Sequence, residues 1–423
     1  MNKSGSLLFV AYLSLLSMLG FIATDIYLPA FKAIEISFNT SPENVASTLS
    51  CFLAGLAIGQ LLYGPLVQRF GKRNSLIMGL ALFGFASLMV ALSHDIVAFN
   101  VGRFFQAIGA CSASVIWQAI VIEQNDEKSA QRIFSNIMPL VALSPALAPL
   151  VGAYLLTLGD WRTIFWVLSL LSALLIVATF LWVEHNSVAR TTVSAESSVG
   201  HHGYLSMLNH PRFLGNVIIF GACSGAFFSY LTLWPIVMQQ QGYQATEIGL
   251  SFIPQTLMFI LGGILSKSLI KKLGRELSLH LVLGLFGLCI LGIALSTLVF
   301  KFDGIWPMLF IFAVMAAANG ACYPIVVNDA LQQFKQDSAK AAGLQNFIQI
   351  SMGFGASSLV ALWAQQGKVA ITIAILVCAA IVIVASKMRK LQHWQDLEQH
   401  FQLPDPANIR FNRHGGNKGN RDV

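Results

Sequence analysis

Twelve long apolar runs, separated by short polar loops, fill most of this 423-residue chain. A run of about 20 mostly apolar residues crosses the hydrocarbon core of a bilayer as a helix. A helix also satisfies its backbone hydrogen bonds within the segment itself, as a spanning segment in lipid must unless it belongs to a closed barrel. Charged residues make up 11% of the chain, against about 25% in soluble domains. The sequence therefore predicts an all-α integral membrane protein and argues against a water-soluble enzyme.

The basic residues predict how the spans are oriented. The spans are predicted at residues 6–28, 45–66, 75–93, 97–122, 133–158, 162–183, 213–238, 246–270, 278–300, 305–330, 341–366 and 369–387. This even number puts both termini on one side. Of the 26 Lys and Arg residues, Arg103 lies within a span, and the loops opposite the termini hold only Lys32, Arg162, Lys301 and Lys368. The other basic residues lie on the side of the termini, which the positive-inside rule predicts to be the cytoplasm.

A polar break in the middle of the chain divides the spans into two sets of six. We predict an N-terminal bundle over 1–184, a cytoplasmic linker over 185–210, a second bundle over 211–388, and a cytoplasmic tail over 389–423. The tail is expected to begin as an interfacial helix and to end disordered. The basic loop at Gly64 to Arg73 is echoed by a second basic loop at Lys267 to Arg275, at the same place in the other half. Two matching six-helix bundles around a central cavity are typical of secondary transporters.

Several segments resemble the motifs of a known family. Those that carry the resemblance are 24–30, 64–73, 103–110, 115–119, 139–152 and 318–327. Residues 64–73 resemble the cytoplasmic loop signature of the major facilitator superfamily, and residues 103–110 resemble its fourth-span motif. Residues 139–152 and 24–30 are similar to the Bcr/CflA drug-resistance branch, while 115–119 and 318–327 look most like its purine nucleoside transporters. The resemblance implies the major facilitator fold of twelve transmembrane helices in two pseudo-symmetric bundles.

The resemblance also implies a set of gating residues. In the loop signature these are Gly64, Gln68, Arg69 and Gly71. The family normally has an acid where this chain has Gln68, which puts the usual electrostatics of the gate in question, and Ala107 replaces a glycine of the fourth-span motif. In the fifth span, Pro145 and Pro149 remove backbone donors and bend the helix. That bend suits a helix that changes curvature between two states, although a static kink is the alternative.

Asp25 and Arg103 are the candidate proton-coupling residues. An ionised carboxylate within the membrane is costly, so Asp25 is expected to bind and release a proton as its surroundings change. The alternative is a hydrated acid that caps the turn before Pro29. Arg103 lies near the same end of its own span, where a buried guanidinium needs an acceptor. The alternative for Arg103 is a side chain that extends to the lipid headgroups.

Uncharged polar residues within the spans predict the substrate site. In the fourth span, Trp117 offers a flat aromatic face beside the amide of Gln118, a combination that suits stacking and hydrogen bonding with a purine. In the second half, the candidates are Phe227, Gln255, Asn319, Tyr323, Gln345, Asn346 and Gln349. So many polar groups at mid-depth favour a hydrated site for a neutral solute. Hydrogen bonding between helices is the alternative for the amides, as an interfacial anchor is for Trp117 and apolar packing for Phe227.

Two functions in transport stay open at this stage. The first is proton-coupled transport of purine nucleosides or similar small neutral solutes by alternating access, favoured by the amides. The second is a multidrug/proton antiporter that exports drugs such as bicyclomycin or chloramphenicol, favoured by abundant Phe and Met. An integral membrane enzyme is less well supported because no HExxH or GxSxG motif is present.

The remaining expectations concern location and partners. We expect a multi-pass protein of the bacterial inner membrane that works as a monomer with protons, lipid and a small-molecule substrate, and without nucleic acid. No P-loop is present, and the six cysteines lie singly in separate spans. The sequence therefore predicts no cofactor and no metal site.

Overall fold

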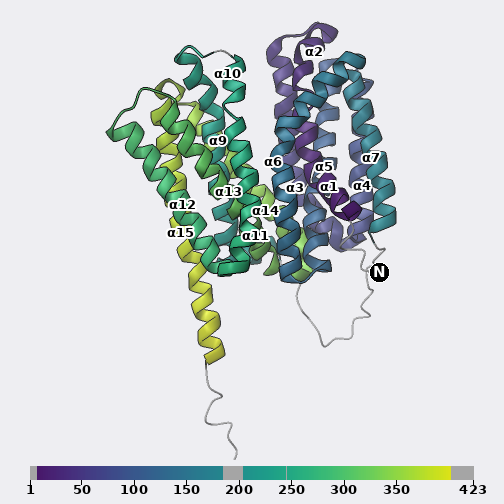
Figure 1. Ribbon diagram of the computed structural model, residues 1–423. Coiled ribbons are helices and arrows are strands. Elements are labelled where there is room, and N and C mark those ends of the chain that lie inside the picture. Colours follow the sequence, from purple (N-terminus) through teal and green to yellow (C-terminus); the bar gives the residue numbers. More distant parts are fainter. Residues whose placement is uncertain (1–6, 184–202, 244, 402–423) are drawn as a thin grey trace, which may run out of the picture.

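Two helical bundles stand side by side in the computed structural model of the protein (Figure 1). The structure describes residues 7–183, 203–243 and 245–401, without the side chains at 7, 42, 43, 46, 50, 142, 145, 146, 245, 246, 364 and 390–401. Of the predicted linker, 185–202 lies outside the described residues, as does 402–423 of the predicted tail. Within the described ranges, six long helices precede the linker and six follow it, and α1 begins at the end where α15 leaves the body.

The first bundle follows the predicted spans closely. Its elements are α1 (Leu7–Asp25), η2 (Leu28–Ala30), α2 (Phe31–Phe38), α3 (Pro42–Phe70), α4 (Lys72–Ala91), α5 (Ile96–Gln124), α6 (Glu127–Leu158) and α7 (Arg162–Trp182). Side chains cap several of these helices: Asp95 accepts from the backbone N–H of Val97 and Ala98 at the start of α5. Such caps satisfy amides that have no partner within the helix. The short helix α2, which extends the first span, was not predicted.

The second bundle has the same plan. Its elements are α9 (Pro211–Gln240), α10 (Ala245–Leu250), α11 (Ile253–Leu273), α12 (Arg275–Ala294), the π-helical η3 (Leu295–Val299), α13 (Trp306–Gln332), η4 (Lys335–Asp337), α14 (Ser338–Ala361), η5 (Ala364–Gln366) and α15 (Lys368–Phe401). A short helix, α8 (Tyr204–Leu208), precedes it at the end of the linker. In the part of the chain that the structure describes, ten helical segments are long and apolar enough to cross a membrane. The other two long helices, α6 and α14, lie at the junction of the bundles, where α6 packs against α11 and α13, and α14 against α3 and α5.

One glycine makes the same tight turn in each bundle. Gly71 joins α3 to α4 with φ +79° and ψ 162°, and Gly274 joins α11 to α12 with φ +77° and ψ 169°. Side chains disfavour a positive φ, so glycine suits both positions. The predicted echo between the two basic loops is therefore a repeated backbone geometry, in which Gly71 and Gly274 correspond.

Glycines also bring helices into backbone contact. An added Cβ at Gly55 of α3 would overlap the carbonyl oxygen of Phe104 on α5, and one at Gly262 of α11 would overlap that of Ala317 on α13. Small residues allow such close approach between membrane helices. The bundles are thus held rigidly at corresponding helix pairs, α3 with α5 and α11 with α13.

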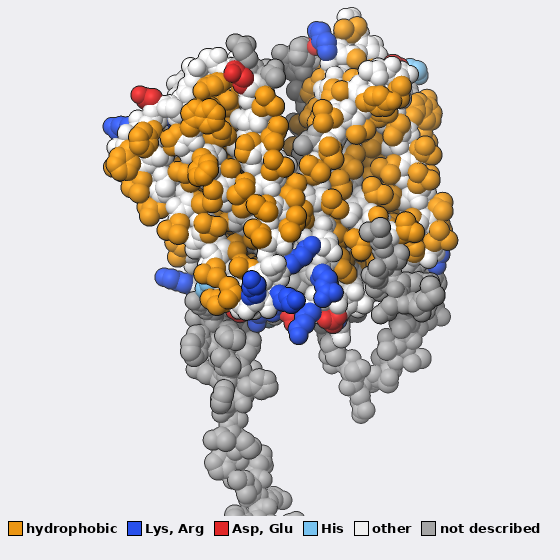
Figure 2. Space-filling model, viewed as in Figure 1, with side chains coloured by type: hydrophobic (Ala, Val, Ile, Leu, Met, Phe, Trp, Pro, Cys, Tyr) orange, Lys and Arg blue, Asp and Glu red, His pale blue; other side chains and the backbone are white. Residues whose placement is uncertain are grey.

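The two ends of the molecule differ in charge and in closure. A broad apolar belt crosses both bundles on the face shown in Figure 2, and Lys and Arg gather at one end, called here the basic end. The turns at Gly71 and Gly274 lie at the basic end, beside Lys72 and Arg275. At the opposite end, called the open end, a hollow separates the bundles (Figure 2). The bundles therefore meet at the basic end and part at the open end.

Candidate functional site

Asp25 is the last residue of α1, on the side of the open end, and its side chain is half-buried. Among the described residues, no hydrogen bond or ion pair reaches its carboxylate. The next residue, Ile26, touches α6: an added Cβ at Gly152 would overlap the carbonyl oxygen of Ile26. The glycine at the end of the fifth-span motif thus allows α6 to pack directly beside the acid.

Arg103 is fully buried in the first bundle, so it does not extend to the headgroups. Its guanidinium carbon lies 4.1 Å from the ring centres of both Tyr27 and Phe52. Nη1 donates to the Ala23 carbonyl at 3.0 Å and to Gln106 Oε1 at 2.5 Å. Nε and Nη2 have no partner within the described part of the chain.

The structure therefore brings Arg103 to α1, two residues before Asp25, without an ion pair between the two side chains. A buried cation with two unpaired nitrogens is electrostatically incomplete: the charge of Asp25 is near enough to act on it, but no direct ion pair offsets its burial. Asp25 and Arg103 therefore lie in the same region of the first bundle. Among the described residues, Nε and Nη2 of Arg103 donate no hydrogen bond to Asp25 in this state.

A cluster of polar side chains joins the two bundles. Gln118 Nε2 donates to Asn346 Oδ1 at 3.2 Å, and Asn346 Nδ2 donates to Gln60 Oε1 at 3.3 Å. Gln345 Nε2 reaches Gln118 Oε1 at 3.4 Å, and Gln60 Nε2 donates to Ser114 at 3.1 Å. We call these five residues the amide cluster. It links α3 and α5 to α14, so three of the predicted substrate residues hold the bundles together in this state.

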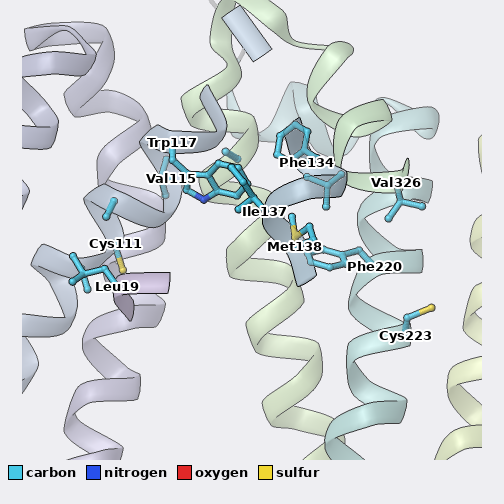
Figure 3. Packing of buried hydrophobic residues seen from close by; sticks show 14 of the residues in the cluster. Leu19, Cys111, Val115, Trp117, Phe134, Ile137, Met138, Phe220, Cys223 and Val326 are labelled. Carbon is cyan, nitrogen blue, oxygen red and sulfur yellow. The ribbon is translucent and has the colours of Figure 1, made fainter. Parts of the chain in front are cut away.

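Trp117 lies next to the amide cluster and is almost fully buried. Its ring meets Phe134 of α6 edge to face, with ring centres 5.2 Å apart. Figure 3 shows Trp117 and Phe134 within one buried apolar cluster that also includes Phe220 of α9. Its aromatic face is therefore packed in this state, and it is not an anchor at the surface.

Asn319 stands apart from the other predicted residues. It is buried on α13, and both its amide oxygen and its amide nitrogen have no hydrogen-bond partner among the described residues. One turn later, Tyr323 Oη lies 3.3 Å from Ser224 Oγ, which also accepts from Gln349 Nε2 at 3.1 Å. Polar groups buried without a partner are rare in native proteins. Asn319 therefore has hydrogen-bonding capacity for a water or a ligand inside the second bundle.

Aromatic rings surround Gln255 of α11. Gln255 Nε2 donates to Tyr230 Oη at 2.8 Å, while its Oε1 is buried and unpaired. Tyr230 stacks on Phe312 with ring centres 3.6 Å apart. Phe227, one turn before Tyr230, is half-buried and lies 6.3 Å from Phe312. The second bundle thus combines an aromatic stack with unpaired amide atoms.

Polar side chains close the basic end across the junction. Gln68 Nε2 donates to Asp337 Oδ1 at 2.5 Å, and Ser338 Oγ donates to Glu123 at 2.5 Å. Glu123 also pairs with Lys72 within the first bundle. In addition, Arg275 pairs with Glu127 across the junction. An acid is therefore present at this contact, on the second bundle, as Asp337 opposite Gln68.

The other predicted gating residues lie around this contact. Gly64 faces α14, where an added Cβ would lie 2.8 Å from Lys340 Cα. Arg69 is exposed and stacks on Phe70. Pro149 is half-buried on α6, which continues as a helix from Glu127 to Leu158, and the side chain of Pro145 lies outside the described residues.

Asp329 of α13 is the centre of a charged cluster at the basic end of the second bundle. It is buried, and Arg212, Arg275 and Arg389 approach it at 2.9, 3.4 and 3.2 Å, while Asn216 donates to it at 2.7 Å. The three arginines come from α9, α12 and α15. Arg275 thus links this buried acid to the contact with Glu127.

Several contributors were missed by sequence reasoning. Gln60 and Ser224 are single polar residues in apolar spans, a signal that was present but indistinguishable from ordinary packing. Asp337 is the last residue of the short 3-10 helix η4 and matches no motif.

Comparison with known proteins places these features in a family. The family model described as Major Facilitator Superfamily matches residues 13–357. A protein of Haemophilus influenzae named "Bicyclomycin resistance protein homolog" is 25% identical over 361 residues, which cover 85% of this chain and 90% of that protein. "Multidrug transporter MdfA" of Edwardsiella piscicida is 26% identical over 258 residues, 61% of this chain and 63% of its own length.

Solved structures share the fold. The transporter FucP in an outward conformation has a TM-score of 0.71 at 15% identity, over 92% of this chain and 99% of FucP. A bacterial homologue of the iron transporter ferroportin, in an outward-facing state, has a TM-score of 0.71 at 13% identity, over 92% of this chain and all of that one. At these identities the likeness concerns the twelve-helix fold alone.

Proposed function

We propose that this chain, which belongs to the Major Facilitator Superfamily, exports drug-like organic solutes in exchange for protons. The observation that carries the proposal is the similarity to the bicyclomycin resistance homologue over 90% of that protein's length. Membership makes the chain a multi-pass membrane transporter and not an enzyme. The relatives favour the drug exporter over the purine nucleoside transporter that the sequence analysis put first.

The orientation forms part of the proposal. We infer a bacterial inner-membrane protein that works as a monomer, with its basic end and both termini in the cytoplasm, because basic residues are retained on that side. The hollow at the open end would then face the periplasm (Figure 2). Export requires a second state in which the contacts at the basic end break and the open end closes.

Asp25 and Arg103 would carry the coupling. Among the described residues, the Asp25 carboxylate has no hydrogen bond or ion pair, and Nε and Nη2 of Arg103 on the neighbouring helix have no partner. In one state Asp25 would be protonated and neutral, and in another it would be ionised and paired with Arg103. Such an exchange would link proton movement to the position of the bundles, because Arg103 already contacts α1 at Ala23.

The second bundle would supply the polar wall of the substrate site. Asn319 offers a donor and an acceptor, and Phe227 offers a half-buried ring in the same bundle. Tyr323, Gln255 and Gln349 would support this wall through their hydrogen bonds with α9. Gln118, Gln345, Asn346 and Trp117 would become available to a solute only when the junction opens.

Replacing Asn319 with leucine should weaken substrate binding by about tenfold, because a ligand would lose hydrogen bonds to a buried amide. Leucine has a similar size, so the thermal stability should be retained. Titration of purified protein with chloramphenicol measures the affinity. The control is Asn328→Leu, another buried asparagine on α13, nearer the basic end. Unchanged affinity in Asn319→Leu would remove this residue from the site.

The function itself is tested with purified protein in liposomes under an imposed pH gradient. Proton-driven movement of labelled chloramphenicol or bicyclomycin supports the proposal, and movement of neither drug refutes it. Purine nucleosides remain a second candidate because the unpaired donor and acceptor of Asn319 match the edge of a purine. Inhibition by adenosine but not by a pyrimidine nucleoside would favour that candidate.

Restoring the family's acid in the cytoplasmic loop should destabilise the closed basic end. In Gln68→Asp, a carboxylate would face Asp337 where a hydrogen bond of 2.5 Å now joins the bundles. Two like charges about 4 Å apart repel by roughly 1–4 kcal/mol in a solvated site. Spin labels on the basic ends of the two bundles should report a larger separation. The double variant Gln68→Asp/Asp337→Asn should return to the wild-type distance, and a failure to do so would contradict the assigned contact.

A further inference from the structure

Pro65 leaves one backbone carbonyl of α3 without its helical partner. In an α-helix the carbonyl of residue 61 accepts from the N–H of residue 65, but proline has no N–H. The helix nevertheless continues through Pro65 to Phe70. The carbonyl of Leu61 therefore needs a donor from outside the helix, since its surroundings are partly buried and a backbone group that loses its hydrogen bond there is costly.

The donor is a side chain of the linker. Tyr204 Oη donates to the Leu61 carbonyl oxygen at 2.6 Å. Tyr204 is the first residue of α8, and its side chain is half-buried. Burial raises the pKa of the Tyr204 phenol to about 12, so the hydroxyl keeps its proton at any physiological pH and remains a donor.

Gly64 makes room for this contact. An added Cβ at Gly64 would lie 2.7 Å from Tyr204 Oη and 2.7 Å from Lys340 Cγ of α14. Three elements thus converge on one point of α3: the proline that frees the carbonyl, the glycine that leaves space, and the linker tyrosine. Gly64 and Pro65 of the loop signature together allow the hydrogen bond from Tyr204 to the Leu61 carbonyl, because Gly64 leaves space for the tyrosine and Pro65 leaves the carbonyl without a helical donor.

The helix α8, which carries Tyr204, packs on the second bundle. Only two residues separate α8 from α9, and α8 packs against α9 and α14. Met207 of α8 is fully buried. The bond from Tyr204 to Leu61 consequently joins the second bundle to α3 of the first bundle, at the end where the two bundles are closed.

We propose that α8 is a latch, in which the hydrogen bond from Tyr204 to Leu61 holds the basic end closed and is released when that end opens. The proposal rests on the alternating-access function proposed above. It adds that the end of the linker takes part in the conformational equilibrium and does not merely connect the bundles. Because Pro65 removes the internal donor, α3 is a better acceptor for the latch than a regular helix would be.

The test measures the separation of the basic ends with spin labels on Asn74→Cys and Lys272→Cys, two exposed positions on opposite bundles. The six native cysteines are first replaced, and the folding of that background is verified by thermal unfolding in detergent. Tyr204→Phe keeps the ring and loses the donor. It should raise the ratio of open to closed basic ends by about tenfold, the worth of one hydrogen bond. Tyr243→Phe, on a tyrosine between α9 and α10, is the matched control and should leave the distances unchanged.

A second comparison isolates the role of Pro65. In Pro65→Ala the helix regains an N–H for the Leu61 carbonyl, so adding Tyr204→Phe should then have a much smaller effect than in the wild type. Equal effects on both backgrounds, or no effect of Tyr204→Phe at all, would overturn the latch. The distances are measured without substrate, so a failure to find the transported drug leaves this test intact.

Discussion

Asp25→Asn is expected to reduce proton-driven drug export to the level of protein-free liposomes. Asparagine has the same shape but cannot release a proton, so a pH gradient would no longer drive the conformational cycle. The half-buried carboxylate has no hydrogen bond or ion pair among the described residues, so its replacement removes no contact that supports the fold. The variant should therefore express and unfold at the same temperature as the wild type.

Counterflow separates a loss of coupling from a loss of transport. Exchange of labelled for unlabelled drug across the membrane needs the moving bundles but no net proton movement. Asp25→Asn should keep this exchange while losing accumulation under a pH gradient. Asp303→Asn, an exposed acid in the loop between η3 and α13, serves as the control and should retain both activities. Normal gradient-driven accumulation in Asp25→Asn would exclude Asp25 from the coupling mechanism.

The architecture could be predicted from sequence because it depends on local composition. Apolar length gives the spans, and the distribution of basic residues gives their alternation. The repeated loops were recognisable for a similar reason, because both are rich in basic residues, whereas the structure shows that Gly71 and Gly274 make the corresponding turns with a positive φ. Even α6 was predicted as a span, although its prolines lower the helical propensity.

The partners of the polar residues could not be predicted in the same way. Gln118 and Asn346 are 228 residues apart and meet only because two whole bundles close against each other. Their positions on a helix face follow from periodicity, but the face that each helix presents to the other bundle depends on packing in three dimensions. The hydrogen bond between Gln68 and Asp337, which are 269 residues apart, could not be predicted for the same reason.

The conformational state of the transporter also limits what the sequence can predict, because one residue can have different partners as the bundles move. In the present state Gln345 and Asn346 bind the opposite bundle, whereas Asn319 has unpaired polar atoms. A sequence carries no record of which state is populated. Only the structure divides the candidate residues into two groups. Some amides hold the two bundles together, and one, Asn319, has no partner among the described residues and can bind a ligand.

Arg103→Met is expected to abolish transport while leaving the protein folded. Methionine loses the bonds to Ala23 and Gln106, worth about 1.5–3 kcal/mol each for a charged donor, and the contacts with two rings, worth about 2 kcal/mol. These losses are offset by removing a buried cation that lacks an ion pair, whose desolvation costs several kcal/mol. We therefore expect a stability within about 2 kcal/mol of the wild type, measured by thermal unfolding in detergent.

Arg103→Lys supplies the complementary comparison. It keeps the positive charge, but an ammonium group cannot reach both acceptors while lying flat between Tyr27 and Phe52. If the charge alone matters for coupling, Arg103→Lys should retain part of the proton-driven transport that Arg103→Met loses. If Arg103→Met instead unfolds at a much lower temperature, the arginine is needed for the structure of the first bundle. Proton-driven transport by Arg103→Met at the wild-type rate would show that Asp25 works without this partner.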